Sequence, residues 1–355
     1  MNNTKYLSEM AKTITPYQWA TNVRSEVLRF DTNTLPQPPP SVKTFVASLK
    51  NDCPINEYGD PSYNKLKKLI ARYERVGEDM ITVTNSGDEA LDIVGKAFLN
   101  PGDYFLIQPP TYEIFSSQCE INRGKQIEVP LLPDSFAPDW KRLKKALNNT
   151  SVKITFVCTP NNPTGTITPM ETVKAIAQAS SGIVLVDEAY REFWGKTNIS
   201  LLEKYRNIVI LRSFSKFGAM AGARVGYLIA NKKFSQVFDA IRFPLGVSYF
   251  SCKLAELVLR QDQQWIKQQI ILIQKERDRL TKALTKLGLL VYPSKANFLL
   301  IQIGVNAKTV CRALKKRNIL VRDRSKKKYL EGCVRITIRS PKENNILINN
   351  LREIL

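Results

Sequence analysis

The stretch Ser213-Phe214-Ser215-Lys216, followed eight residues later by Arg224, decides how this 355-residue chain is interpreted. It comes directly after the apolar run 208–211, which has the length and composition of a buried strand. A lysine becomes nucleophilic near neutral pH only when burial or a nearby positive charge disfavours its ammonium form. Taken alone, Lys216 is more simply explained as a solvated lysine after a strand. Whether Lys216 is a reactive lysine must therefore be judged from the residues around it.

Short apolar runs alternate with helical patterns through most of the chain. Strands are expected at residues 80–83, 104–107, 126–129, 153–158, 183–186, 208–211 and 225–230, with helices between them. This alternation predicts an α/β fold whose mostly parallel sheet is covered by helices on both faces. A helical stretch at about 251–287 then leads to a smaller α/β unit, with strands at 298–303, 319–321 and 333–338.

The length of the chain and one proline-rich run suggest three parts. A chain of 355 residues is too long for one small core. The run 36–40 is rich in proline and forms a rigid linker after a polar N-terminal segment. We therefore expect an arm at 1–40, a large domain at 41–245 and a small C-terminal domain at 246–355, entered by a long helix.

Polar side chains follow several of the expected strands, at the edge where α/β sheets place their ligand sites. Asp187 ends the strand at 183–186, and a carboxylate there would keep a pyridine nitrogen protonated. Asn162 and Tyr190 are candidates to hydrogen-bond a phenolic oxygen, and Tyr112 to stack on a ring face. Each has a plainer explanation as a capping aspartate, a turn asparagine or a core tyrosine. Together they point to pyridoxal phosphate.

A second set of residues suits the phosphate of that cofactor. Ser213, Ser215 and Arg224 offer two hydroxyls and a guanidinium, which bind a dianion by charge-assisted hydrogen bonds. Ser86-Gly87-Asp88 opens a helix after a strand, so its backbone N–H groups can point at the same phosphate. Simple N-capping explains Ser86 and Asp88 equally well.

Composition excludes several classes of protein. The chain has no histidine, which removes Ser-His and Cys-His dyads and imidazole metal sites, and we expect no metal. The net charge of +21 invites a nucleic-acid interpretation. However, the basic residues are spread along the chain and no nucleic-acid-binding motif accompanies them. We therefore expect a lysine-rich surface that steers anionic substrates, and no nucleic-acid partner.

Cysteine usage and hydropathy bear on the compartment. The six cysteines form no C-x-x-C pair and are typical of thiols in a reducing cytoplasm. No apolar run has membrane-spanning length, and residues 1–20 lack the apolar core of a signal peptide. We expect a cytoplasmic protein without a membrane partner.

Several motifs in chain order resemble those of fold-type I pyridoxal-phosphate aminotransferases, and within them the histidinol-phosphate aminotransferases. The resemblance runs over nearly the whole chain. Its segments are Thr15-Pro16-Tyr17-Gln18, Tyr58-Gly59-Asp60, Asn85-Ser86-Gly87-Asp88-Glu89, Pro110-Thr111-Tyr112, Pro160-Asn161-Asn162-Pro163-Thr164-Gly165, Val186-Asp187-Glu188-Ala189-Tyr190, Leu211-Arg212-Ser213-Phe214-Ser215-Lys216, Ala296-Asn297-Phe298, Ile319-Leu320-Val321-Arg322-Asp323 and Val334-Arg335-Ile336-Thr337-Ile338.

The resemblance implies specific roles for the cofactor residues. Lys216 would form the covalent imine with the cofactor's aldehyde and move the reacting proton, assisted by Asp187 and Tyr190. Tyr58 would reach across the interface of a homodimer, with shared active sites, to the partner's cofactor phosphate.

The resemblance also implies a substrate pocket and a reaction. Arg335 would hold the substrate's anionic group, and Tyr17, Asn33, Asn162 and Arg322 would complete the pocket. The expected reaction exchanges an amino group between L-glutamate or 2-oxoglutarate and imidazole-acetol phosphate or L-histidinol phosphate. The alternatives are an aromatic aminotransferase and a phospho-amino-acid decarboxylase of the same fold.

Two departures from the family pattern fall on the expected substrate side. The usual N-x-N-E-N-P run reads Asp31-Thr32-Asn33-Thr34-Leu35-Pro36 here and loses its glutamate and two of its three asparagines. Arg339 replaces the glycine that usually follows the R-I-T segment. These changes bear on the identity of the substrate more than on the binding of the cofactor.

Overall fold

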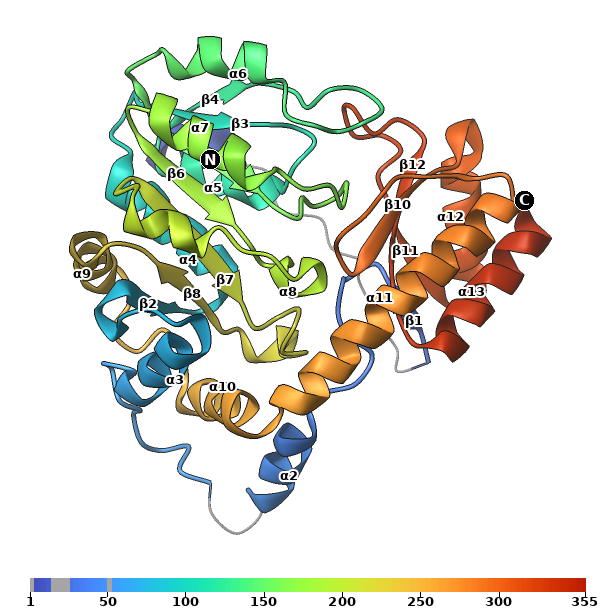
Figure 1. Ribbon diagram of the computed structural model, residues 1–355, viewed down its shortest axis with the longest axis horizontal. Coiled ribbons are helices and arrows are strands. Elements are labelled where there is room, and N and C mark those ends of the chain that lie inside the picture. The colour runs from blue at the N-terminus through green and yellow to red at the C-terminus, as the bar shows by residue number, and fades with distance from the viewer. Residues whose placement is uncertain (1–2, 14–25, 50–52) are drawn as a thin grey trace.

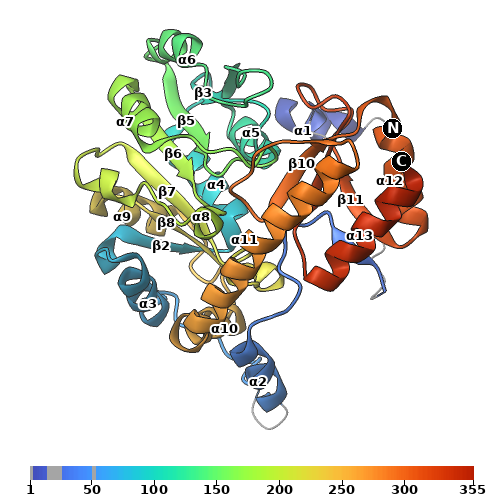
Figure 2. The same cartoon turned by 45° about the vertical axis from the view of Figure 1, so that its right-hand side comes forward.

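The computed structural model describes residues 3–13, 26–49 and 53–355. Within these ranges the chain builds two β-sheets, and one long helix, α11 (Gln263–Lys286), runs from one sheet to the other (Figures 1 and 2). Tyr17 lies outside the described residues.

The larger sheet has seven strands in the order β2-β8-β7-β6-β5-β3-β4. The strands are β2 (Ile81–Thr84), β3 (Tyr104–Ile107), β4 (Lys125–Glu128), β5 (Val152–Cys158), β6 (Ile183–Asp187), β7 (Ile208–Ser213) and β8 (Gly226–Ile229). Only β8 is antiparallel to its neighbours, β2 and β7, and the other pairs are parallel. The predicted mostly parallel sheet is confirmed.

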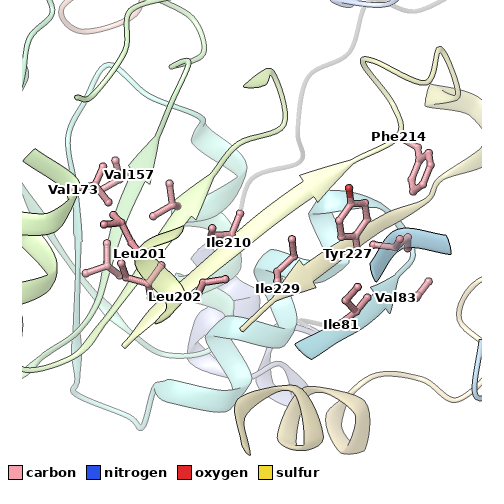
Figure 3. Packing of buried hydrophobic residues seen from close by; sticks show 14 of the residues in the cluster. Ile81, Val83, Val157, Val173, Leu201, Leu202, Ile210, Phe214, Tyr227 and Ile229 are labelled. Carbon is pink, nitrogen blue, oxygen red and sulfur yellow. The ribbon is translucent and has the colours of Figure 1, made fainter. Parts of the chain in front are cut away.

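Alternate residues of the central strands face opposite sides of this sheet, as the two-residue period of a strand requires. Ile210 lies in one hydrophobic core and Leu211 in the other. The first core, which Figure 3 shows around Ile210 and Ile229, is covered by α3 (Asn64–Glu74), α6 (Trp140–Leu147), α7 (Met170–Ala179) and α10 (Tyr249–Gln261). The second is covered by α4 (Ser86–Phe98), α5 (Glu113–Ile121) and α9 (Lys232–Ile241). Burial on both faces explains why these strands are almost wholly apolar.

The smaller sheet has five strands in the order β1-β11-β12-β10-β9. They are β1 (Leu28–Phe30), β9 (Leu290–Val291), β10 (Phe298–Gln302), β11 (Ile319–Asp323) and β12 (Cys333–Thr337), with α11, α12 (Ala307–Lys316) and α13 (Pro341–Ile354) packed on them. Strand β1 belongs to the expected arm and pairs in parallel with β11. Three residues are too short a run to predict a strand, so its place in the sheet follows from tertiary pairing.

The prediction of a single helical stretch at 251–287 is wrong, because this segment contains two helices, α10 and α11, that meet at Asp262. The Asp262 carboxylate accepts hydrogen bonds from the backbone N–H and the hydroxyl of Ser41. Ser41 lies in the first turn of α2 (Pro40–Ser48), where backbone N–H groups lack helical partners. The remaining helices are α1 (Glu9–Thr13) and α8 (Arg191–Trp194). Among the described residues, no helix combines the length and the apolar character needed to cross a bilayer.

A buried ion-pair network lies behind the carboxyl ends of β6 and β7. Arg212 Nη2 is 2.9 Å from Glu188 Oε2 and 3.4 Å from Glu74 Oε2 of α3, and all three residues are buried. Tyr227 donates a hydrogen bond of 2.6 Å to Glu74, and the backbone N–H of Asn198 donates one of 2.6 Å to Glu188. The network ties α3 and the strand ends together.

We expect Arg212→Met to destabilise the fold by about 3–5 kcal/mol, because it leaves the buried carboxylate of Glu188 without its guanidinium, whereas Glu74 keeps Arg191 as a partner. Heat denaturation followed by circular dichroism measures the loss. Arg142→Met is the matched control, since Arg142 is 71% exposed in its ion pair with Asp139, and its effect should stay within about 0.5 kcal/mol. Equal melting temperatures for wild type and Arg212→Met would contradict a structural role for the network.

Candidate active site

A cavity of about 290 Å³ opens at the carboxyl ends of β6 and β7 and the first turn of α4. Residues 31–34 of the arm and strands β11 and β12 close its other side. The predicted site residues that line it are Asn33, Ser86, Gly87, Asp88, Tyr112, Asn162, Asp187, Tyr190, Ser213, Ser215, Lys216, Arg224, Arg322 and Arg335. Elements from both sheets therefore meet at one site.

The first turn of α4 forms one wall and has a constrained backbone. Ser86 has φ of 74° and Arg224 has φ of 53°, a region that side chains other than glycine rarely adopt. Arg224 Nη2 donates hydrogen bonds to Ser86 Oγ at 2.7 Å and Asp88 Oδ2 at 2.6 Å. A Cβ at Gly226 would lie 2.6 Å from the carbonyl carbon of Ser86, so only glycine lets these segments approach. Strain of this kind is typical of binding sites.

Hydroxyl groups from the end of β7 and from the loop after it face the same turn. Ser213 and Ser215 line the cavity, and Ser213 Oγ accepts a hydrogen bond of 3.2 Å from the backbone N–H of Ser215. Tyr112 donates a hydrogen bond of 2.9 Å to Asp88 Oδ1, which holds its ring beside the helix start. Helix N–H groups, hydroxyls and a guanidinium together make a strong site for a phosphate.

Asp187 ends β6 deep in the cavity. Its Oδ1 accepts a hydrogen bond of 3.0 Å from the backbone N–H of Ala189, and Cys158 Sγ is 3.8 Å from its Oδ2. Burial raises the pKa of Asp187 to about 6, and the nearby carboxylate of Asp88 adds to the shift. No cationic side chain is hydrogen-bonded to Asp187 among the described residues. The carboxylate is therefore suited to a cationic ligand group.

Lys216 is placed as a reactive amine. Its Nζ donates a hydrogen bond of 3.2 Å to the carbonyl oxygen of Thr32 and lies 5.8 Å from the centre of the Tyr190 ring. Burial lowers the pKa of Lys216 to about 8, and the positive charges of Arg335 and Arg224 contribute. A sizeable fraction of the amine is therefore neutral near physiological pH.

The arm joins the site through hydrogen bonds. Asn33 Nδ2 donates to the Tyr190 hydroxyl at 3.0 Å, and burial raises the pKa of that hydroxyl. Arg335 Nη1 donates to Asn162 Oδ1 at 2.7 Å, and its Nη2 donates to the carbonyl oxygen of Asp31 at 2.5 Å. Thr32 and Asp31 make these contacts with backbone carbonyls. The altered side chains of this run therefore do not disturb them.

Three arginines on neighbouring strands point to an anionic ligand. Arg322 of β11 is directly opposite Arg335 of β12 in the antiparallel ladder, where like charges destabilise a sheet. Arg324, two residues after Arg322, also lines the cavity. Sequence analysis missed Arg324, although the two-residue period of a strand places it on the same face as Arg322. The repulsion among these cations favours binding of an anion.

Other predictions fall outside the cavity. Tyr58 does not line it and is 88% exposed. Arg339 was expected on the substrate side, and this prediction is wrong. Its guanidinium lies 2.7 Å from Glu343 and donates to the carbonyl oxygen of Arg29 at 3.2 Å, so it ties α13 to β1. Among the described residues, no cluster of His, Cys, Asp or Glu could hold a metal ion.

The chain belongs to the aminotransferase class I and II family, whose profile matches residues 22–351. It is 37% identical over 329 residues to the histidinol-phosphate aminotransferase of Thermoanaerobacter pseudethanolicus, covering 92% of this chain and 93% of that protein. It is 31% identical over 350 residues to the histidinol-phosphate aminotransferase of Flavobacterium johnsoniae, covering 97% and 96%.

Solved structures give the same fold. The histidinol-phosphate aminotransferase of Sinorhizobium meliloti, in complex with pyridoxal-5'-phosphate, superposes with a TM-score of 0.86 at 25% identity and covers 98% of this chain and 97% of that one. The histidinol-phosphate aminotransferase of Clostridium acetobutylicum superposes with a TM-score of 0.83 at 24% identity, covering 92% and 99%. The predicted fold type I is confirmed.

The Lys216 amine should titrate near pH 8, whereas ordinary exposed lysine amines titrate at about 10.4. Reductive methylation of the cofactor-free protein at a series of pH values, quantified by peptide mass spectrometry, measures the midpoint for each lysine. Arg335→Gln should raise the Lys216 midpoint, because it removes a neighbouring cation. A midpoint shared with the exposed lysines of the same sample would refute the proposed environment.

Proposed function

We propose that this protein is a pyridoxal-phosphate-dependent histidinol-phosphate aminotransferase. In the proposed reaction, imidazole-acetol phosphate and L-glutamate are interconverted with L-histidinol phosphate and 2-oxoglutarate. The observation that carries the proposal is one cavity that is lined both by Lys216 and Asp187 and by Arg322 and Arg335, which face each other across the β11–β12 ladder. The relatives that share more than 30% identity over most of the chain, and are named for this activity, support the same substrate.

The donors of the cavity fit the cofactor. Its phosphate would be held by Arg224, the hydroxyls of Ser213 and Ser215, and the backbone N–H groups that begin α4. The backbone is strained at Ser86 and Arg224, and Gly226 approaches Ser86 so closely that a side chain at position 226 would not fit. Asp187 would pair with the protonated ring nitrogen. This positive charge would stabilise the buried carboxylate, whose pKa is raised when no cation is bound. Tyr190 and Asn162 would hydrogen-bond the ring's phenolic oxygen, and Tyr112 would stack on the ring. When bound, pyridoxal phosphate delocalises the electron pair left on the substrate's Cα.

Lys216 would move the reacting proton. Its lowered pKa keeps part of the amine neutral, so Nζ can accept a proton from the substrate's Cα. The hydrogen bond to the carbonyl oxygen of Thr32 orients Nζ and lies on the side closed by the arm. Residues 31–34 also limit the access of water to this atom.

Arg335 would hold the substrate. It is 5% exposed, and hydrogen bonds to Asn162 and to the carbonyl oxygen of Asp31 fix its guanidinium. L-Glutamate presents a carboxylate and L-histidinol phosphate a phosphate, and a planar guanidinium can bind either as a fork. Arg322 would supply the second cation.

We also propose a homodimer with shared active sites. Exposed apolar side chains gather where the segment 55–63 meets the segment 242–249, with Tyr58 at 88% and Phe243 at 73% exposure. Arg242 Nη2 donates to the carbonyl oxygen of Pro61 at 2.7 Å, which holds the two segments together. A surface of this kind favours association with a second copy, and Tyr58 would then reach the partner's cofactor phosphate.

We assign the enzyme to the cytoplasm. All six cysteines are free thiols, as is usual in a reducing compartment.

Purified protein loaded with pyridoxal phosphate should form L-glutamate from L-histidinol phosphate and 2-oxoglutarate. Borohydride treatment followed by peptide mapping should find the pyridoxyl adduct on Lys216. Lys216→Ala should lose about 10²- to 10⁴-fold in kcat, the usual contribution of a positioned proton-transfer group. The exposed-lysine variant Lys232→Ala is the control and should keep full activity.

Two outcomes would contradict the proposal. An adduct on a different lysine would remove the assignment of Lys216. Release of CO₂ from a phosphorylated amino acid without need for 2-oxoglutarate would identify a decarboxylase instead, and preference for an aromatic amino acid would identify an aromatic aminotransferase.

Tyr58→Phe should weaken cofactor binding about tenfold while leaving the dimer intact, since it removes one hydrogen bond to a charged group. Titration of the cofactor-free protein with pyridoxal phosphate measures the dissociation constant, and analytical ultracentrifugation measures the oligomeric state. Tyr6→Phe is the control, because Tyr6 is likewise exposed, at 79%. A monomer with undiminished cofactor affinity would rule out the shared site.

A further inference from the structure

Arg324 is a buried cation at the junction of two cavities. Its backbone N–H donates to the carbonyl oxygen of Cys333 at 3.0 Å, which extends the β11–β12 ladder by one residue. Its side chain lines the cavity that holds Lys216 and also a larger one, of about 1010 Å³, between α5, β4 and the segment 323–330. Only 6% of the residue is exposed.

The guanidinium of Arg324 has unused donor capacity. Its Nη1 is 3.4 Å from each carboxylate oxygen of Glu113, which is long for a charge-assisted hydrogen bond. Its Nε is buried and has no hydrogen-bond partner. A buried N–H group without a partner is costly, so one that persists calls for a ligand or another physical reason.

Glu113 can release Arg324 without becoming unpaired. Lys327 Nζ lies 3.1 Å from Glu113 Oε1 and is 54% exposed. Burial raises the pKa of Glu113, but the charges and hydrogen bonds of Arg324 and Lys327 lower it by a larger amount. The pKa of Glu113 therefore lies below the ordinary value. The carboxylate therefore stays ionised and keeps Lys327 as a partner when Arg324 turns towards a ligand.

The cavity has cations at two separate places. Arg224, with Ser86 and Asp88, lies at the expected cofactor phosphate. Arg322 and Arg324 line the cavity from one face of β11. A carboxylate carries one negative charge, whereas a phosphomonoester carries nearly two at neutral pH and has three acceptor oxygens.

We propose that Arg324 determines specificity for a phosphomonoester by binding, together with Arg322, the phosphate of the amino substrate, while Glu113 holds its guanidinium in place until the substrate enters. This inference rests on the proposed function, because it assumes a phosphorylated substrate. It adds a third guanidinium to those that the family resemblance implies. L-Glutamate, whose distal group is a single carboxylate, depends on Arg324 much less.

The contact between Arg324 and the substrate's phosphate is tested by comparing two ligands, with and without the phosphate, in wild type and in Arg324→Gln. Calorimetry on the cofactor-loaded protein compares the dissociation constants of L-histidinol phosphate and unphosphorylated L-histidinol for wild type and Arg324→Gln. We expect Arg324→Gln to weaken binding of L-histidinol phosphate about 10- to 100-fold, the range for a hydrogen bond to a charged group. Binding of L-histidinol and the KM for L-glutamate should change by less than about threefold.

Two variants separate recognition from general electrostatics. Lys327 does not line the Lys216 cavity, and Lys327→Gln removes one positive charge and the second partner of Glu113. It should therefore weaken binding of L-histidinol phosphate by less than about threefold, the usual size of an exposed ion pair, and leave binding of L-histidinol unchanged. Glu113→Gln should not weaken binding of L-histidinol phosphate, because its carboxylate only competes for Arg324. An equal loss for phosphorylated and unphosphorylated ligands in Arg324→Gln, or a loss in Lys327→Gln as large as in Arg324→Gln, would overturn the proposal.

Binding of inorganic phosphate tests the role of Arg324 separately from the proposed function. If wild type does not prefer L-histidinol phosphate to L-histidinol, the assigned substrate is wrong. The affinity of the cofactor-loaded protein for inorganic phosphate then decides the role of Arg324. Weaker phosphate binding in Arg324→Gln, with a much smaller loss in Lys327→Gln, supports an anion site at Arg324. Equal phosphate affinity in wild type and Arg324→Gln overturns it.

Discussion

The ion pair between Arg212 and Glu188 connects the two strand ends on which the candidate site depends. Because side chains alternate along a strand, the residues next to this pair, Ser213 and Asp187, point to the opposite face and into the cavity. The sheet thus uses one face of each strand end for buried charge pairing and the other for ligand binding. Glu74 extends the pairing to α3, so a helix far from the cavity helps to hold its geometry.

Several features of the cavity lower the stability of the cofactor-free protein. Arg322 and Arg335 face each other across a ladder, Asp187 is buried without a cationic partner among the described residues, and the backbone at Ser86 is strained. Each feature is unfavourable in the cofactor-free protein, and the two charge features become favourable when a group of opposite charge binds. Binding of cofactor and substrate therefore stabilises the fold as well as filling the site.

Much of the large sheet could be predicted from sequence, because most of its strands are apolar runs, and the strand ends differ from expectation by at most two residues. Lys216, Asp187 and Arg224 could be identified because each stands in a short motif beside such a run. The helix break at Asp262 could not, since it depends on a contact with Ser41, more than two hundred positions away. Strand β1 was missed for the same reason, as its three residues gain stability only through pairing with β11.

The amino-acid sequence by itself determined which residues alternate between the two faces of β6 and β7, because that period is a local property of an extended chain. It also determined the chemical types available at the strand ends. Only the tertiary structure decided that the carbonyl oxygen of Thr32 meets Lys216 and that Arg324 joins two cavities. Those contacts join segments distant in the chain, and the pairing of strands and the packing of helices, which no local pattern encodes, bring them together.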